Sequence, residues 1–290
     1  MSSKLIRPLY SDAALKKQID ASKSNPREDR FDAWWLGQSG FLVQWNGHSL
    51  LIDPYLSDSL TIKYANTDKP HVRMSERVID PAMLTNIDIV TSSHNHTDHL
   101  DADTLIPLMK ANPGIRFVIP EANREFVCER IKCDGAFPIG MNDGESVVVH
   151  PFTFHGIPSA HNEIERDAEG RCKFMGYVIR FGSFSIYHSG DTLLYEGLDS
   201  LLKPFRIDVA FLPINGNLPS RRVAGNMNAD EAARLAKSIG ARLVIPHHYH
   251  MFEFNTADPA LLEAAARRQN QPYKVLLLGE SITYPTQPSS

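Results

Sequence analysis

The alternation of apolar and polar positions predicts an N-terminal helix followed by a β-rich opening. Residues 11–23 carry apolar side chains at helical spacing, and a polar connector then extends to residue 30. The short runs 32–36, 41–45 and 49–53 have β character, and Asn46-Gly47 between the last two is a strong hairpin signal. We therefore expect a helical extension over residues 1–30, followed by a β-meander.

From residue 87 onward, predicted strands alternate with predicted helices. Single strands are expected at 87–92, 115–119, 176–181, 184–188, 208–212, 241–245 and 274–278, and a pair of strands around 146–155. Helices are expected at 102–112, 121–131, 193–203, 228–239 and 259–269. Asn228 and Glu231 resemble a capping box, and Gly240 fits the end of the same helix. A meander followed by strand–helix units, twice over, predicts two sheets packed face to face with helices outside.

Length and composition favour one globular domain, which we place at residues 31–280, with a tail over 281–290. The 290 residues are 42% hydrophobic and 22% charged, and no apolar run approaches the roughly 20 residues of a membrane helix. The start lacks a secretory pattern, and the three cysteines lack metal-type spacing, so we expect a cytoplasmic protein. The net charge of −4 argues against nucleic acid as a partner.

The chemistry is concentrated where an apolar strand leads into His94, His96, Asp98 and His99. In an extended backbone His94 and His96 point the same way, and a turn at Thr97 would aim Asp98 and His99 at a second point nearby. Imidazole and carboxylate ligands suit zinc, manganese or iron, and the absence of cysteine ligands favours a catalytic site. One loop is therefore predicted to bind two metal ions.

The segment 94–99 reads His-x-His-x-Asp-His and so resembles the hallmark motif of the metallo-β-lactamase superfamily. Later motifs occur in the order of that superfamily: Pro-Ser-Ala-His at 158–161, His-Ser-Gly-Asp-Thr at 188–192 and Pro-His-His-Tyr at 246–249. The resemblance covers roughly residues 31–280 and implies an α/β fold, the αββα sandwich of two mixed sheets. It also implies a ligand set: His94, His96 and His161 for one metal, Asp98, His99 and His248 for the other, and Asp191 as the bridge.

Alternatives remain at four of these motifs. They are His247 in place of His248, His155 in place of His161, a helix-capping role for Asp191, and either a turn or support of a ligand histidine for Asp53.

Within the superfamily, the chain is most similar to the L-ascorbate-6-phosphate lactonase-like branch. The similarity rests on residues 34–37, 51–55, 187–191, 212–216 and 247–255. It implies a lactone-opening hydrolase that uses two divalent ions, zinc or manganese, to make hydroxide at neutral pH, with Asp98, Asp191 and His248 in catalytic positions. The chain departs from the branch at His250, where an acidic residue is common, which weakens the transfer of the exact substrate.

Four residues are candidates for binding the substrate. Arg221 and Arg222 suit a phosphate group, since guanidinium binds phosphate in a bidentate manner, while Tyr249 and His250 adjoin the predicted ligand His248 and are placed to steady a leaving group or oxyanion. The expected partner is a small molecule such as a phosphorylated sugar lactone, with no membrane partner and with homo-oligomerisation left open.

Two other functions compete with the lactonase hypothesis. The same metal pair would hydrolyse a small or lipid phosphodiester. A non-catalytic metal-binding scaffold is disfavoured because all seven ligands are present. The polar loop 56–80, which includes Tyr64, His71 and Arg73, is predicted to form a lid or an oligomer contact.

Overall fold

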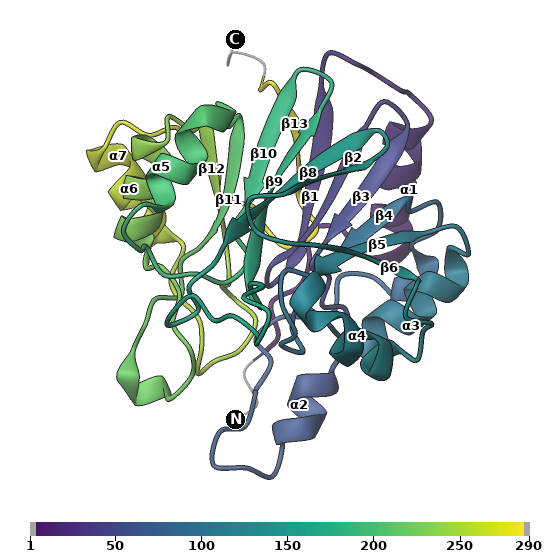
Figure 1. Cartoon of the computed structure of the whole chain (residues 1–290), viewed down its shortest axis with the longest axis horizontal. Helices are drawn as coiled ribbons and strands as arrows, with labels where there is room; N and C mark the ends of the chain where they lie inside the picture. Colours follow the sequence, from purple (N-terminus) through teal and green to yellow (C-terminus); the bar gives the residue numbers. More distant parts are fainter. Residues whose placement is uncertain (1–3, 287–290) are drawn as a thin grey trace.

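The computed structural model describes residues 4–286, in which two mixed β-sheets pack face to face between helices (Figure 1). The first sheet has the order β13-β1-β2-β3-β4-β5-β6 and contains β1 (Phe31–Gly37), β2 (Gly40–Trp45), β3 (His48–Ile52), β4 (Ile89–Thr91), β5 (Arg116–Pro120), β6 (Pro138–Met141) and β13 (Ser281–Tyr284). The second has the order β12-β11-β10-β9-β8-β7 and contains β7 (Ser146–Val149), β8 (Phe152–Pro158), β9 (Met175–Phe181), β10 (Phe184–His188), β11 (Val209–Pro213) and β12 (Leu243–His247).

Each sheet joins antiparallel strands to a parallel set. Strands β3 to β6 are parallel in the first sheet, and β10 to β12 are parallel in the second. Aromatic side chains fill the space between the sheets: the rings of Phe41 on β2 and Phe211 on β11 lie 4.2 Å apart, and those of Phe31 on β1 and Phe181 on β9 lie 5.3 Å apart. The predicted αββα sandwich is therefore confirmed.

Helices cover both outer faces (Figure 1). Beside the first sheet lie α1 (Asp12–Lys23), α3 (Ala102–Ala111) and α4 (Arg124–Ile131); beside the second lie α5 (Leu198–Leu202), α6 (Ala229–Ser238) and α7 (Ala260–Arg268). The predicted capping box is present at the start of α6, because the Glu231 amide donates to Asn228 Oδ1 at 3.0 Å and the Asn228 amide donates to Glu231 Oε2 at 2.9 Å. Within the described residues, no helix has both the length and the apolar character needed to cross a membrane.

The N-terminal helix is part of the main core. Leu15 and Ile19, four positions apart on α1, are fully buried in the same apolar cluster as the first sheet. The predicted extension therefore packs on the catalytic domain, and its removal would expose core surface.

Four local predictions differ from the structure. The loop 56–80 contains a short helix, α2 (Ser59–Tyr64), and the helix expected over 193–203 is limited to α5. That helix starts late because Leu193 N donates to Ala160 O and Gly197 has a φ of +91°. Residues 274–278 form no strand, whereas Ser281–Tyr284, expected in the tail, form β13 and pair with β1. The end of the predicted tail, residues 287–290, lies outside the described residues.

Strand ends converge at the edge of the sandwich where α2 lies (Figure 1). The segments that follow β4, β8, β10 and β12 meet there, together with the turn between β1 and β2. In open α/β sheets the carboxyl ends of parallel strands are the usual place for a ligand site.

Candidate metal centre

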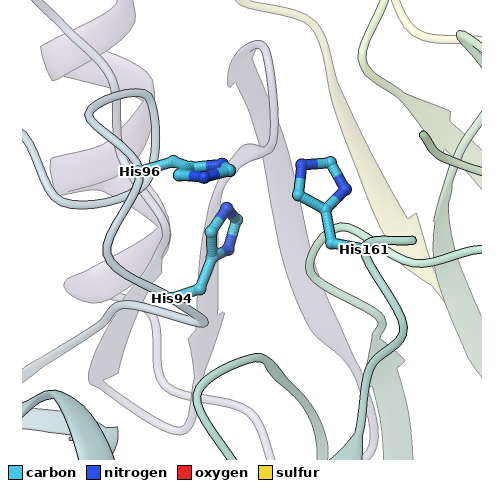
Figure 2. Close-up of side chains that lie close together, drawn as sticks. All are labelled: His94, His96 and His161. Atoms are coloured by element: carbon cyan, nitrogen blue, oxygen red, sulfur yellow. The ribbon is translucent and has the colours of Figure 1, made fainter. Parts of the chain in front are cut away.

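Seven side chains form two adjoining groups at this edge. His94, His96 and His161 make one group and Asp98, His99, Asp191 and His248 the other, and within each group the potential ligand atoms lie within 4.8 Å of one another. Figure 2 shows the three imidazoles of the first group turned toward a common point, two from the loop after β4 and one from the loop after β8. The structure therefore brings together all seven residues that the sequence predicts as ligands.

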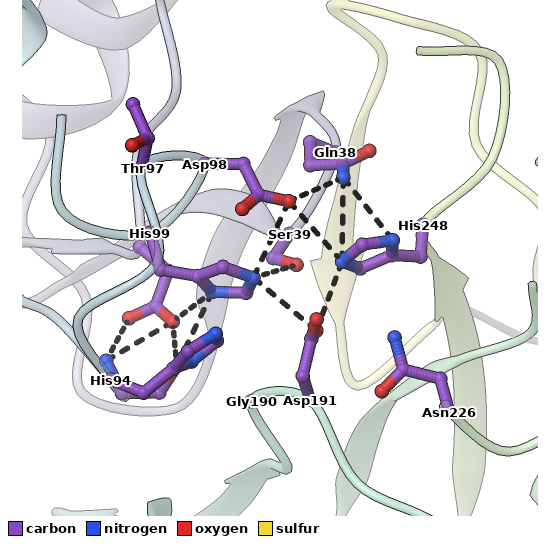
Figure 3. Close-up of polar contacts among 12 residues, drawn as sticks. Gln38, Ser39, His94, Thr97, Asp98, His99, Gly190, Asp191, Asn226 and His248 are labelled. Atoms are coloured by element: carbon purple, nitrogen blue, oxygen red, sulfur yellow. Dashed lines mark hydrogen bonds and ion pairs between the residues drawn. The ribbon is translucent and has the colours of Figure 1, made fainter. Parts of the chain in front are cut away.

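Asp191 lies between the two groups. Its Oδ1 is 2.9 Å from His248 Nε2 and 3.3 Å from His99 Nε2 (Figure 3). Its Oδ2 is 3.6 Å from His161 Nε2. Burial alone would raise the pKa of this carboxyl, but the charges of His248 and His99 outweigh that effect and hold the pKa well below its ordinary value. A carboxylate with one oxygen facing each group has the geometry of a bridging ligand.

The imidazoles are oriented as metal ligands. His161 Nδ1 donates to the carbonyl of Gly225 at 2.8 Å, and His99 Nδ1 donates to Asp53 Oδ2 at 2.7 Å, so both rings direct Nε2 toward the cluster. His94 Nε2 is buried without a hydrogen-bond partner among the described residues, and burial holds the pKa of His94 well below its ordinary value. A neutral buried imidazole with an unused lone pair fits a divalent cation.

Asp53 supports one of these ligands from behind. Its fully buried carboxylate accepts hydrogen bonds from Thr91 Oγ1 at 2.9 Å, from Ser93 N at 3.0 Å and from His99 Nδ1. Burial would raise the pKa of Asp53, but the hydrogen bond and the charge of His99 lower it below its ordinary value. Of the two roles left open for Asp53, the structure therefore favours support of a ligand histidine.

Three residues at the centre have positive φ values, which residues other than glycine rarely adopt. Gly190, directly before Asp191, has a φ of +57°, and a Cβ there would lie 2.7 Å from the Ser93 Cβ, so a glycine is required. Gln38 and His248 are non-glycine residues with φ values of +48° and +63°, and His248 N donates to Gln38 O at 3.1 Å. Such strain is typical of functional sites.

Gln38 contacts the centre although it was not predicted as a site residue. From the turn between β1 and β2, its Nε2 donates to Asp98 Oδ2 at 2.7 Å and lies 3.2 Å from His248 Nδ1 (Figure 3). The sequence does contain a signal for this role, a Gln-Ser pair between two apolar strands. A side-chain amide is buried at such a place only when other polar groups form hydrogen bonds with it.

A pocket of about 460 Å³ opens beside the centre. His96, Asp98, Asp191 and His248 are among the residues that line it. This volume is in the range of small-molecule sites.

Among residues 4–286, two with cationic side chains line the pocket, Lys63 and Arg130. Arg130 is committed to the ligand loop, since its Nη1 donates to the carbonyls of Asn95 at 2.9 Å and Leu100 at 3.1 Å. The Lys63 ammonium makes no hydrogen bond or ion pair with any residue in the described part of the chain and lies 5.1 Å from the Tyr64 ring centre. Lys63 is therefore the cation that remains available to a ligand.

The two arginines expected to bind phosphate do not line this pocket. The Arg221 guanidinium donates to the carbonyls of Asn215 and Thr256 and so fixes the loop between β11 and α6. Arg222 is exposed and pairs with Asp68 at 2.6 Å, which joins that loop to the segment after α2. Both guanidiniums therefore have partners within the protein.

Tyr249 and His250 also lie outside the pocket lining. The Tyr249 side chain is buried, stacks on Trp35 with 4.1 Å between ring centres and donates from its hydroxyl to Leu276 O. His250 is half-buried, and its amide donates to Thr256 Oγ1 at 2.8 Å. Packing therefore accounts for Tyr249.

The competing histidines lie outside both ligand groups. His247 belongs to neither group: its ring stacks on His188 with 4.9 Å between ring centres, and its Nδ1 lies 3.3 Å from Ser39 Oγ. His155 is on β8 and its Nδ1 is in hydrogen-bond contact with Ser146 Oγ. The geometry thus favours His248 over His247 and His161 over His155.

Comparison with known proteins gives the family. A family model described as "Beta-lactamase superfamily domain" matches residues 33–248. A UPF0173 metal-dependent hydrolase of Methanosarcina mazei is 30% identical over 254 residues, which are 86% of this chain and 96% of the relative. A UPF0173 metal-dependent hydrolase of Opitutus terrae is also 30% identical, over 86% of this chain and 97% of the relative.

Solved structures share the fold. The metallo hydrolase Igni18 of Ignicoccus hospitalis superposes with a TM-score of 0.65 at 22% identity and covers 89% of this chain and 100% of its own. An isothiocyanate hydrolase from Delia radicum gut bacteria gives a TM-score of 0.67 at 19% identity, over 87% of this chain and 98% of its own. The chain therefore belongs to the metallo-β-lactamase superfamily, among its metal-dependent hydrolases.

Proposed function

We propose that this hydrolase opens lactones at a centre of two divalent ions, zinc or manganese. The observation that carries the proposal is the placement of Asp191, whose two oxygens face the two ligand groups at the wall of a pocket of substrate size. When bound, such ions lower the pKa of water and polarise the oxygen under attack, which is the chemistry that ester hydrolysis needs. The three cysteines are free, which supports a reducing cytoplasm as the compartment.

The residues of the chain supply orientation and charge. Asp191 and Asp98 are the carboxylates of the centre, and the Gln38 amide fixes one oxygen of Asp98 through its hydrogen bond. His248 adjoins Asp191 on the pocket side, where a substrate carbonyl would approach. Asp98, Asp191 and His248 are thus the proposed catalytic residues.

The charges of the pocket favour a neutral scissile group. Arg130 is held by main-chain carbonyls, so Lys63 is the free cation among the described lining residues. A lactone carbonyl is uncharged and needs no cation from the protein besides the metal ions, whereas a phosphodiester is usually bound by cationic side chains as well.

A phosphodiester is the second candidate, and Lys63 is the observation that favours it. An unpaired ammonium at the pocket suits one phosphoryl oxygen, or the phosphate of a phosphorylated sugar lactone. Arg221 and Arg222 would reach such a phosphate only after leaving their present partners.

The test compares γ-butyrolactone, L-ascorbate 6-phosphate and a bis-aryl phosphodiester on protein loaded separately with zinc and with manganese. The Asp191→Asn variant serves as the blank because it loses the charge between the two ligand groups. Opening of a lactone that is absent from the blank supports the proposal. Turnover of the phosphodiester alone would replace it by the second candidate.

A further inference from the structure

Part of the pocket lining is aromatic. Tyr64, His71, Phe252 and Phe254, which we call the aromatic wall, line the same pocket as His96, Asp98 and Asp191. On the basis of the proposed function, we infer that the substrate carries an apolar ring or hydrocarbon group beside its lactone, and that the aromatic wall binds this group.

The aromatic wall is a built surface with defined ring geometry. The His71 ring stacks on Tyr64 with 4.2 Å between centres and an angle of 18°, and it meets Phe254 edge-on at 4.6 Å and Phe252 at 5.2 Å. His71 Nδ1 donates to Lys69 O at 3.0 Å, which fixes the ring. Ring contacts of this kind hold each side chain in one orientation.

Main-chain hydrogen bonds join the two segments that carry the aromatic wall. Met74 N donates to Met251 O at 2.8 Å, and Glu253 N donates to Val72 O at 3.0 Å. The segment after α2 and the segment after β12 therefore form one unit. Phe252 and Phe254 lie on the loop that carries His248, and the two hydrogen bonds hold the segment with His71 against that loop, so the fold sets the position of the wall relative to the metal centre.

Three members of the aromatic wall are incompletely buried. Tyr64, His71 and Phe254 are half-buried, whereas Phe252 is buried. Aromatic surface left in water is unfavourable in proportion to its area, and a ligand with an apolar group would cover it. Phe126 stands at the same pocket with 38% of its surface exposed, and the Arg130 guanidinium lies 4.4 Å from its ring centre.

A polyhydroxylated substituent fits this wall poorly. Each sugar hydroxyl that leaves water needs a hydrogen-bond partner, and the rings of Tyr64, Phe252 and Phe254 offer few. An apolar substituent gains from the same contact. The wall therefore favours a hydrocarbon substituent over a polyhydroxylated one.

The first experiment compares two lactones with the same ring, γ-phenyl-γ-butyrolactone and γ-butyrolactone, on the zinc-loaded full chain. We expect kcat/KM to be about tenfold higher for the phenyl compound, as burial of a ring of that size allows. Phe254→Ala and Tyr64→Ala should remove most of this ratio. Tyr64→Phe, which keeps the ring, and Tyr10→Ala, an exposed tyrosine outside the pocket, should keep it.

The second experiment measures binding by calorimetry and needs no turnover. We expect 4-phenylbutanoate to bind about tenfold more tightly than butanoate, and Phe254→Ala to abolish the difference. A ratio below twofold in wild-type protein overturns the inference whether or not lactones are opened. If both lactones are opened at equal rates, the lactonase proposal stands and the inference about the aromatic wall fails. If 4-phenylbutanoate binds more tightly but no lactone is opened, the wall binds an apolar group and the lactonase proposal fails.

Discussion

Replacing Asp53 by asparagine tests whether the carboxylate behind His99 sets the metal affinity of the centre. Asp53 uses Oδ2 for His99 Nδ1 at 2.7 Å and Oδ1 for Thr91 Oγ1 at 2.9 Å. Asparagine keeps the shape and one acceptor oxygen, but its NH₂ group would face the Nδ1–H of His99. The imidazole would then rotate or take the other tautomer, in which Nε2 carries the proton and binds no metal.

The loss is that of one charge-assisted hydrogen bond, about 1.5–3 kcal/mol. By the relation between free energy and affinity this is roughly 10- to 150-fold weaker metal binding. The range agrees with the roughly 10- to 100-fold effect that such supporting carboxylates usually have.

Zinc affinity is measured at pH 7 by competition with a chromophoric chelator, and thermal denaturation checks the fold. The matched control is Asp101→Asn, because Asp101 is also a buried carboxylate but bonds to Ser59 Oγ and Thr104 Oγ1 and to no ligand histidine. Zinc affinity within twofold of wild type in a folded Asp53→Asn protein would refute the argument.

Three further predictions concern loops, pH and metal. Arg222→Gln breaks the exposed pair with Asp68, which joins the loop between β11 and α6 to the segment after α2. KM should therefore rise only slightly, by no more than about fivefold, with kcat kept, because exposed ion pairs are weak. Wild-type KM should rise with added salt, and a salt-independent KM would contradict this. The hydrogen bonds from Arg166 lower the pKa of Asp143, so the ionised form of Asp143 stabilises the fold. Asp143→Asn should lower the free energy of unfolding by about 0.5–1 kcal/mol at pH 7, and this difference from wild type should shrink as the pH falls below 3.8. A difference that persists in acid would count against the ion pair. Removal of metal by a chelator should lower Tm, and zinc at about 100 times its Kd should restore about 2.7 kcal/mol; an unchanged Tm would argue against a metal centre.

The sequence indicates which residues meet at the candidate metal centre because each of them follows closely on a strand. Four of the seven lie within residues 94–99, where local geometry already limits their directions, and Asp191 and His248 follow β10 and β12 in motifs of known order. Chain positions that share one edge of a sandwich can be inferred from strand order alone. The fold could therefore be predicted from the sequence, and the family resemblance implied how the candidate ligands are grouped.

The roles of the residues around the ligands are harder to predict from the sequence, because their partners are main-chain atoms far along the chain. Arg221 looked like a phosphate ligand, yet its guanidinium binds the carbonyls of Asn215 and Thr256, and no sequence pattern identifies carbonyl partners. Helix α2 is too short to show a helical period, and the contact of Gln38 with Asp98 depends on a tight turn.

The two ligand groups draw on both halves of the chain. His94, His96, Asp98 and His99 follow a strand of the first sheet, whereas His161, Asp191 and His248 follow strands of the second. A polypeptide cut between β6 and β7 would leave each fragment with an incomplete set, and neither would bind metal as the whole chain does. Recovery of tight zinc binding when the two fragments are mixed would therefore show that the halves have reassembled, so zinc affinity would measure the assembly of the two sheets.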